Sequence, residues 1–229
     1  MKLKHKKHLR KGFSLVELLV VIAIIAGLAA MSYGPIMKQV KAAAKTNAIN
    51  NSKQIFIALT SFASDNDGLF PNAGTAKTGE TGGSAIACFT QLLNAGKIDE
   101  EATFWNAENI VLDTVDAVKP NEDGTLTAGE NAFGYVEGLS SSSRTNLPIT
   151  FDSSTDGKDF NTAVWDGSAI ITKLNGSVKA LPIAYGGGKP LNDDGSGKDG
   201  PINEKRGTSE IDIFAVSSLP GSAIVHGPK

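Results

Sequence analysis

The sequence predicts an α+β fold in which a long N-terminal helix packs on a small antiparallel β-sheet. Three observations predict it. Residues 13–30 form an apolar run long enough for a membrane-spanning helix, and residues 36–64 continue with helical periodicity. Several later segments are β-branched or alternate apolar with polar residues, as half-buried strands do. Asn175-Gly176 separates two of these segments and is a strong hairpin signal.

Charge is divided unevenly along the chain. Six of its 22 basic residues lie in the first twelve positions, although the formal net charge of all 229 residues is only −2. The remainder holds 16 basic and 24 acidic residues, a balance that disfavours a nucleic-acid partner. The 25 glycines and 9 prolines indicate a loop-rich or β-rich body. The single cysteine, Cys88, excludes an internal disulfide.

The apolar run contains one carboxylate, Glu17, near its start. An ionised acid inside a membrane helix costs about 2.5–3.5 kcal/mol, so such a residue is expected to have a function and a partner. The run from 13 to 30 has 18 residues and would be about 27 Å long as a helix, the lower edge of membrane-spanning length. A secretory signal peptide has a shorter apolar core without an acid. We therefore predict that the helix is retained in the membrane.

Residues 11–18, with the sequence KGFSLVEL, resemble the N-terminal signal of type IV pilins and type II secretion pseudopilins. The resemblance implies that a prepilin peptidase and methyltransferase cuts between Gly12 and Phe13, before the apolar helix, and then methylates the new amine of Phe13. It also implies an assembly role for Glu17. The alternative is a plain single-pass anchor in which the glutamate is incidental.

Cleavage would create a cation close to Glu17. The amide nitrogen of Phe13 would become an amine that is largely protonated near neutral pH. Opposite charges attract strongly where the dielectric constant is low, and an unpaired carboxylate there remains unfavourable. Phe13 and Glu17 are one helical turn apart in one chain, and a pair between staggered neighbouring chains is equally reachable. We expect the pair to set the register of assembly, and both geometries remain open.

The helix is predicted to continue beyond the apolar run. Proline removes a backbone donor and clashes with the preceding turn, so we expect a kink near Gly34-Pro35 rather than a stop. One face of the continuation is apolar and should pack on the head, through Ala48, Ile55, Leu59 and Phe62. The predicted organisation is a basic leader at 1–12, a transmembrane and assembly helix at 13–31, an amphipathic continuation at 32–64, and a globular α/β head with a loop-rich C-terminal region at 65–229.

The head is predicted to hold one short helix and an antiparallel sheet of about three to five strands. The helix spans residues 84–95 and ends at Gly96, and Cys88 lies in it as a small buried residue. The predicted strands are 133–136, 147–151, 163–165, 169–174 and 177–181. This layout of one long helix and a sheet resembles that of the major pseudopilin, and the runs 64–71, 133–139 and 174–179 resemble pseudopilin-type proteins.

Two acidic, glycine-rich loops were considered as calcium sites. Residues 119–130 follow the EF-hand pattern in part, but Lys119 stands where the first carboxylate is needed, so we do not predict a site there. In the second loop, Asp193, Asp194 and Asp199 could supply oxygen ligands. The resemblance supports this because major pseudopilins bind calcium in their C-terminal loops. We favour a solvated turn with calcium as the alternative, and we expect no required cofactor.

The sequence gives no support for an enzyme. Only His226 remains after processing, and residues 140–143 lack the glycines of a nucleophile elbow. We predict a structural subunit of a type IV pilus-like or type II secretion pseudopilus filament, polymerised with identical or different pilin-like subunits. The lone cysteine favours the pseudopilus. The chain would span the bacterial inner membrane once with its head in the periplasm, and the filament would lie in the periplasm or at the cell surface.

Two alternatives remain. An uncleaved, membrane-anchored periplasmic binding module would keep its leader. A minor pilin for DNA uptake would need a basic head, which the acidic balance disfavours.

Overall fold

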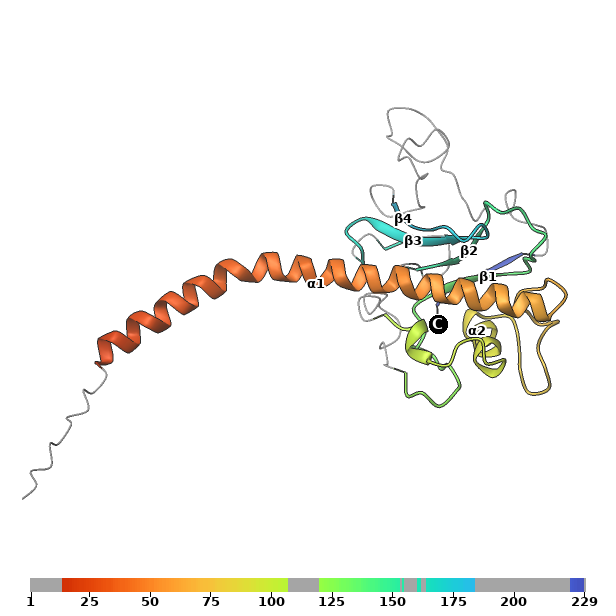
Figure 1. The fold of residues 1–229 in the computed structure, drawn as a ribbon, viewed down its shortest axis with the longest axis horizontal. Helices are drawn as coiled ribbons and strands as arrows, with labels where there is room; N and C mark the ends of the chain where they lie inside the picture. Colours follow the sequence, from red (N-terminus) through yellow and green to blue (C-terminus); the bar gives the residue numbers. More distant parts are fainter. Residues whose placement is uncertain are drawn as a thin grey trace, which may run out of the picture. The chain divides into compact units, whose positions relative to one another are not determined.

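The computed structural model describes residues 14–106, 120–152, 154, 160–161, 164–183 and 223–228. The chain divides into two compact units, residues 1–42 and 43–229. The helices and strands, labelled in Figure 1, are α1 (Leu15–Asp65), α2 (Ala85–Asn94), the 3-10 helix η1 (Glu101–Phe104), β1 (Gly134–Glu137), β2 (Pro148–Phe151), β3 (Ser168–Lys173), β4 (Val178–Pro182) and β5 (Ile224–His226). A long apolar N-terminal helix and a small antiparallel sheet confirm the predicted α+β, pilin-like arrangement.

Helix α1 is continuous for 51 residues and includes Pro35. The expectation that Pro35 does not end the helix is therefore confirmed. Proline cannot donate a hydrogen bond to the carbonyl of Met31, four residues earlier. One turn before Pro35, the Ser32 hydroxyl donates to the Leu28 carbonyl at 2.9 Å. At the other end of α1, the N–H of Gly68 donates to the Ala63 carbonyl at 2.8 Å and closes the last turn.

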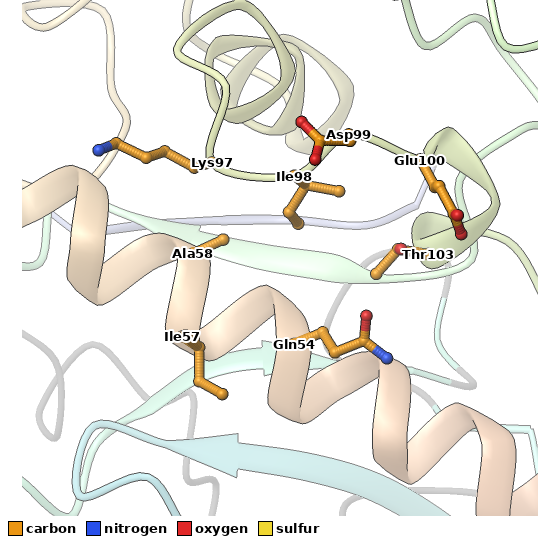
Figure 2. A pocket seen from close by; sticks show the side chains of 8 residues that line it. All are labelled: Gln54, Ile57, Ala58, Lys97, Ile98, Asp99, Glu100 and Thr103. Carbon is orange, nitrogen blue, oxygen red and sulfur yellow. The ribbon is translucent and has the colours of Figure 1, made fainter.

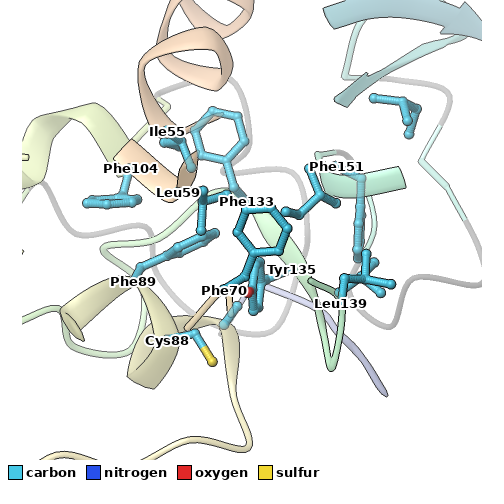
Figure 3. Packing of buried hydrophobic residues seen from close by; sticks show 14 of the residues in the cluster. Ile55, Leu59, Phe70, Cys88, Phe89, Phe104, Phe133, Tyr135, Leu139 and Phe151 are labelled. Atoms are coloured by element: carbon cyan, nitrogen blue, oxygen red, sulfur yellow. The ribbon is translucent and has the colours of Figure 1, made fainter. Parts of the chain in front are cut away.

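The core of the second unit forms where α1 meets the sheet and α2. The four apolar residues predicted to face the head are all buried: Ala48, Ile55, Leu59 and Phe62. In Figure 3, Ile55 and Leu59 of α1 lie beside aromatic rings from α2, η1 and the sheet. Phe89 stacks on Phe104 with 4.9 Å between the ring centroids and meets Tyr135 edge-on at 5.5 Å. These contacts fix the second half of α1 to the head.

The short helix confirms its prediction within a residue at each end. Ser84 caps α2 by accepting the N–H of Ala87 at 3.1 Å. Gly96 follows the helix with a φ of 61°, a left-handed conformation that glycine adopts without strain.

The sheet has five strands in the order β4-β3-β2-β1-β5, and every neighbouring pair is antiparallel. Asn175-Gly176 forms the predicted hairpin between β3 and β4, and Gly176 has a φ of 79°. Strand β5, close to the C-terminus, pairs with β1, and His226 lies opposite Tyr135. The sequence analysis did not predict β5, because three residues are too few for a periodic pattern.

One predicted strand, 163–165, is wrong at residues 164 and 165, the two that the structure describes. Residues 164–166 form a turn, and Asp166 has a φ of 51°. The apolar character of this segment arises from burial rather than from strand pairing. Trp165 packs with Ala48, Val164 and Ile170 in a small second cluster, and its indole N–H donates to the buried carboxylate of Asp152.

Candidate assembly site

The candidate site begins in the first turn of α1. The backbone N–H of Ser14, directly before the helix, donates to Oε2 of Glu17 at 2.8 Å. Ser14 and Glu17 occupy the two ends of a Ser-x-x-Glu capping box, in which the glutamate binds the backbone N–H of the residue that precedes the helix. The positive end of the helix dipole also favours an acid in the first turn. The sequence analysis missed this local role, although the Ser-x-x-Glu spacing could have revealed it.

The part of α1 that directly follows Glu17 is apolar, and its side chains are exposed. No charged residue lies between Glu17 and Lys38, so 20 consecutive residues, about 30 Å of helix, are uncharged. All residues from 14 to 40 are exposed. By length and composition α1 can cross a membrane. Tyr33, 69% exposed, lies near the end of the uncharged stretch, at a position typical of aromatic residues at a membrane surface.

The remaining predicted site residues lie outside the described part of the chain. They are the cleavage residues Gly12 and Phe13 and the three possible calcium ligands, Asp193, Asp194 and Asp199. The cleavage, the methylation and the calcium site therefore stay predictions. Among the described residues, no group of three or more histidine, cysteine, aspartate or glutamate side chains could hold a metal ion.

The described part of the EF-hand-like loop binds a carboxylate. Glu101, 1% exposed, accepts the N–H groups of Glu122 at 2.8 Å and Thr125 at 2.8 Å, and also that of Gly124. Glu122 in turn accepts the N–H of Glu101 at 2.9 Å and that of Ala102 at 3.1 Å. A calcium loop directs oxygen atoms inward, whereas this loop directs N–H groups at Glu101. The acidic residues here join η1 to the loop.

A second buried carboxylate, Glu137, joins three separate segments. It accepts the N–H of Ala73 at 2.9 Å and that of Gly83 at 3.1 Å, and its Oε2 lies 2.7 Å from Nε2 of His226 on β5. Burial and the negative charge of Glu137 raise the pKa of the nearby Cys88 from 9.0 to about 12. A thiol with such a pKa is a poor nucleophile, which agrees with the prediction of Cys88 as a small buried residue of the core.

Comparison with known families identifies the N-terminus. The family model for the prokaryotic N-terminal methylation motif matches residues 7–33. The match includes the predicted cut between Gly12 and Phe13, Glu17 and the whole apolar run. It indicates a type IV pilin-like precursor and implies processing by prepilin peptidase and assembly with other pilin subunits. No curated protein and no solved structure matches the chain.

Proposed function

We propose that this chain is a structural, non-enzymatic subunit of a type IV pilus-like or type II secretion pseudopilus filament. The precursor is inserted in the bacterial inner membrane, cut after Gly12 and assembled through α1, with the head in the periplasm. The observation that carries the proposal is the position of Glu17. It lies within the matched methylation motif, in the first turn of an exposed apolar helix that has no other charge before Lys38.

The geometry of Glu17 supports an assembly role. Oε2 accepts the N–H of Ser14, whereas Oε1 has no hydrogen bond within the described residues. Cleavage after Gly12 would place a positive amine on Phe13, and a second copy could present this amine to Oε1. An ion pair in a low-dielectric membrane is favourable only when both partners are present. The register in which neighbouring copies bring Glu17 and Phe13 together would therefore be more stable than other registers.

One feature favours a secretion pseudopilus over a surface pilus subunit, and another disfavours a DNA-uptake pilin. The only cysteine, Cys88, is buried and free, so the head has no disulfide of its own. Residues 66–229 also carry 22 acidic and 12 basic residues, which disfavours a DNA-uptake role. The competing function is an uncleaved, membrane-anchored binding module.

The test compares the wild-type chain with Glu17→Val and Glu17→Gln in a bacterial host that supplies prepilin peptidase and the assembly machinery. Mass spectrometry of the N-terminus and electron microscopy of sheared filaments are the readouts. We expect an N-methylated Phe13 in all three proteins and filaments only from the wild type, because both variants remove the negative charge. An intact Met1 leader on the wild type would refute processing, and normal filaments from Glu17→Val would refute the assembly role.

A further inference from the structure

The two ends of the mature chain differ in charge. Between Glu17 and Asp65, helix α1 carries four lysines and no acidic residue. Residues 66–229 carry 22 acidic and 12 basic residues. Copies of this chain therefore offer a basic helix and an acidic head, and the two surfaces attract each other.

The second unit has a pocket of about 390 Å³ between α1 and the segment that follows α2. Figure 2 shows Ile98 directed at α1 above Ala58, and Ile57, 64% exposed, also lines the pocket. The exposed side chains of Asp99 and Glu100 lie at its rim. Lys97, the one basic residue of the lining, forms an ion pair with Asp65. The lining thus combines three apolar residues, Ile57, Ala58 and Ile98, with polar ones that include Gln54 and Thr103. Its two acids have no basic neighbour in the lining other than a lysine that is already paired.

A segment of α1 has the opposite character. In residues 36–41, which we name the stem segment, the side chains of Ile36, Met37 and Val40 are 55%, 49% and 51% exposed. Lys38 and Lys41 lie between and beside them along the helix. The segment lies outside the hydrophobic clusters of the head. Large exposed apolar side chains of this kind usually mark a contact surface.

We propose that the pocket binds the stem segment of a second copy of this chain. Ile57, Ala58 and Ile98 would receive apolar side chains of the stem segment, and Asp99 and Glu100 would pair with its lysines. This contact rests on the proposed filament and names an additional interface in it. The stem segment and the α1 wall of the pocket are about 18 residues apart in sequence. The contact therefore joins copies at a sequence offset of about 18 residues, larger than the four positions that separate Phe13 from Glu17.

Disulfide trapping in assembled filaments tests the contact directly. Full-length chains carrying Lys38→Cys and chains carrying Glu100→Cys are expressed together, so that a crosslinked dimer can only join two copies. Cys88 is buried and has a raised pKa, so it does not compete. Lys38→Cys expressed with Lys179→Cys, an exposed position on β4, is the matched control. We expect rapid crosslinking of the first pair and roughly tenfold less of the control pair, a ratio that corresponds to about 1.4 kcal/mol.

Charge reversal separates this contact from its competitors. Asp99→Lys combined with Glu100→Lys should reduce crosslinking between two fixed reporter positions, Ile36→Cys in the stem segment and Thr103→Cys in the pocket lining. Lys38→Glu combined with Lys41→Glu should restore it. If filaments with a methylated Phe13 crosslink no better than the control pair, the contact is refuted and the proposed function stands. A second outcome would also refute the contact: the acid reversal leaves crosslinking unchanged, and the lysine reversal weakens association of the chain with anionic vesicles. The stem segment would then bind lipid headgroups rather than a second copy. Failure of the proposed function is seen separately, as an intact leader.

Discussion

Replacing Glu137 by glutamine should destabilise the head by about 2–4 kcal/mol. Glu137 is 7% exposed, and its two oxygens accept the N–H groups of Ala73 and Gly83 and contact His226. Glutamine offers one acceptor oxygen, so its NH₂ group must face either the N–H of Ala73 or that of Gly83. A hydrogen bond to a charged group contributes about 1.5–3 kcal/mol, and a buried donor left without an acceptor costs about 1–3 kcal/mol. The loss of one such bond, with weakening of the His226 contact, gives the predicted range.

Urea unfolding of the purified full-length chain in detergent measures this loss. Tryptophan fluorescence reports on the head because Trp165 is 1% exposed in the folded chain. The matched control is Glu100→Gln, which makes the same chemical change at an exposed position and should alter the free energy of unfolding by less than about 0.5 kcal/mol. The m-value should be unchanged, since the same surface unfolds. A Glu137→Gln variant as stable as the control would show that the three contacts do not hold these segments together.

Two further predictions concern the same core. Gly134→Ala should lower the free energy of unfolding by about 1–3 kcal/mol in the same urea titration. A Cβ atom at position 134 would lie 2.2 Å from Cζ of the buried Phe151. A variant as stable as the wild type would show that the Phe151 ring has room to move. Burial raises the pKa of Cys88 from 9.0 to about 12, so between these pH values the unfolded chain loses a proton that the folded chain keeps. The contribution of the protonated Cys88 to the free energy of unfolding is therefore fully present below pH 9.0. Above pH 9.0 the free energy of unfolding falls by up to about 1.4 kcal/mol per pH unit. The difference in stability between the wild type and Cys88→Ala should shrink as the pH rises from 9.0, and a constant difference would contradict the raised pKa.

The elements predicted correctly are those whose signals are local. The buried face of α1 follows from helical spacing, and the β3–β4 hairpin follows from Asn175-Gly176, where glycine adopts a φ of 79°. The wrong strand at 163–165 shows the limit of such signals. Val164 and Trp165 are buried in a turn, and Asp152, 13 positions before Trp165, supplies the acceptor for the buried indole N–H. An apolar run indicates burial, but it does not specify which backbone conformation provides it.

The polar contacts of the head could not be predicted, because they join residues that are far apart in sequence. Glu137 and His226 are separated by 89 positions, and β5 is defined mainly by its pairing with β1. Glu101 lies in a short acidic stretch that by itself suggests only a solvated turn. Its carboxylate is nevertheless buried, and it accepts hydrogen bonds from N–H groups of a loop 21 to 24 positions later in the sequence. Each of these contacts depends on two distant segments meeting in the fold, so no pattern within one segment predicts it.

Glu17 combines a local role with the proposed assembly role. In a single copy its Oε2 accepts the N–H of Ser14, so the carboxylate is oriented before any partner arrives. A carboxylate has about four acceptor sites, so a neighbour's amine can bind Oε1 while the Ser14 bond persists. Because the side chain is already restrained, less conformational entropy is lost when the ion pair forms. The capping bond and the ion pair therefore act together. The first stabilises the helix end in the monomer, and in the proposed filament the second would select the register in which copies assemble.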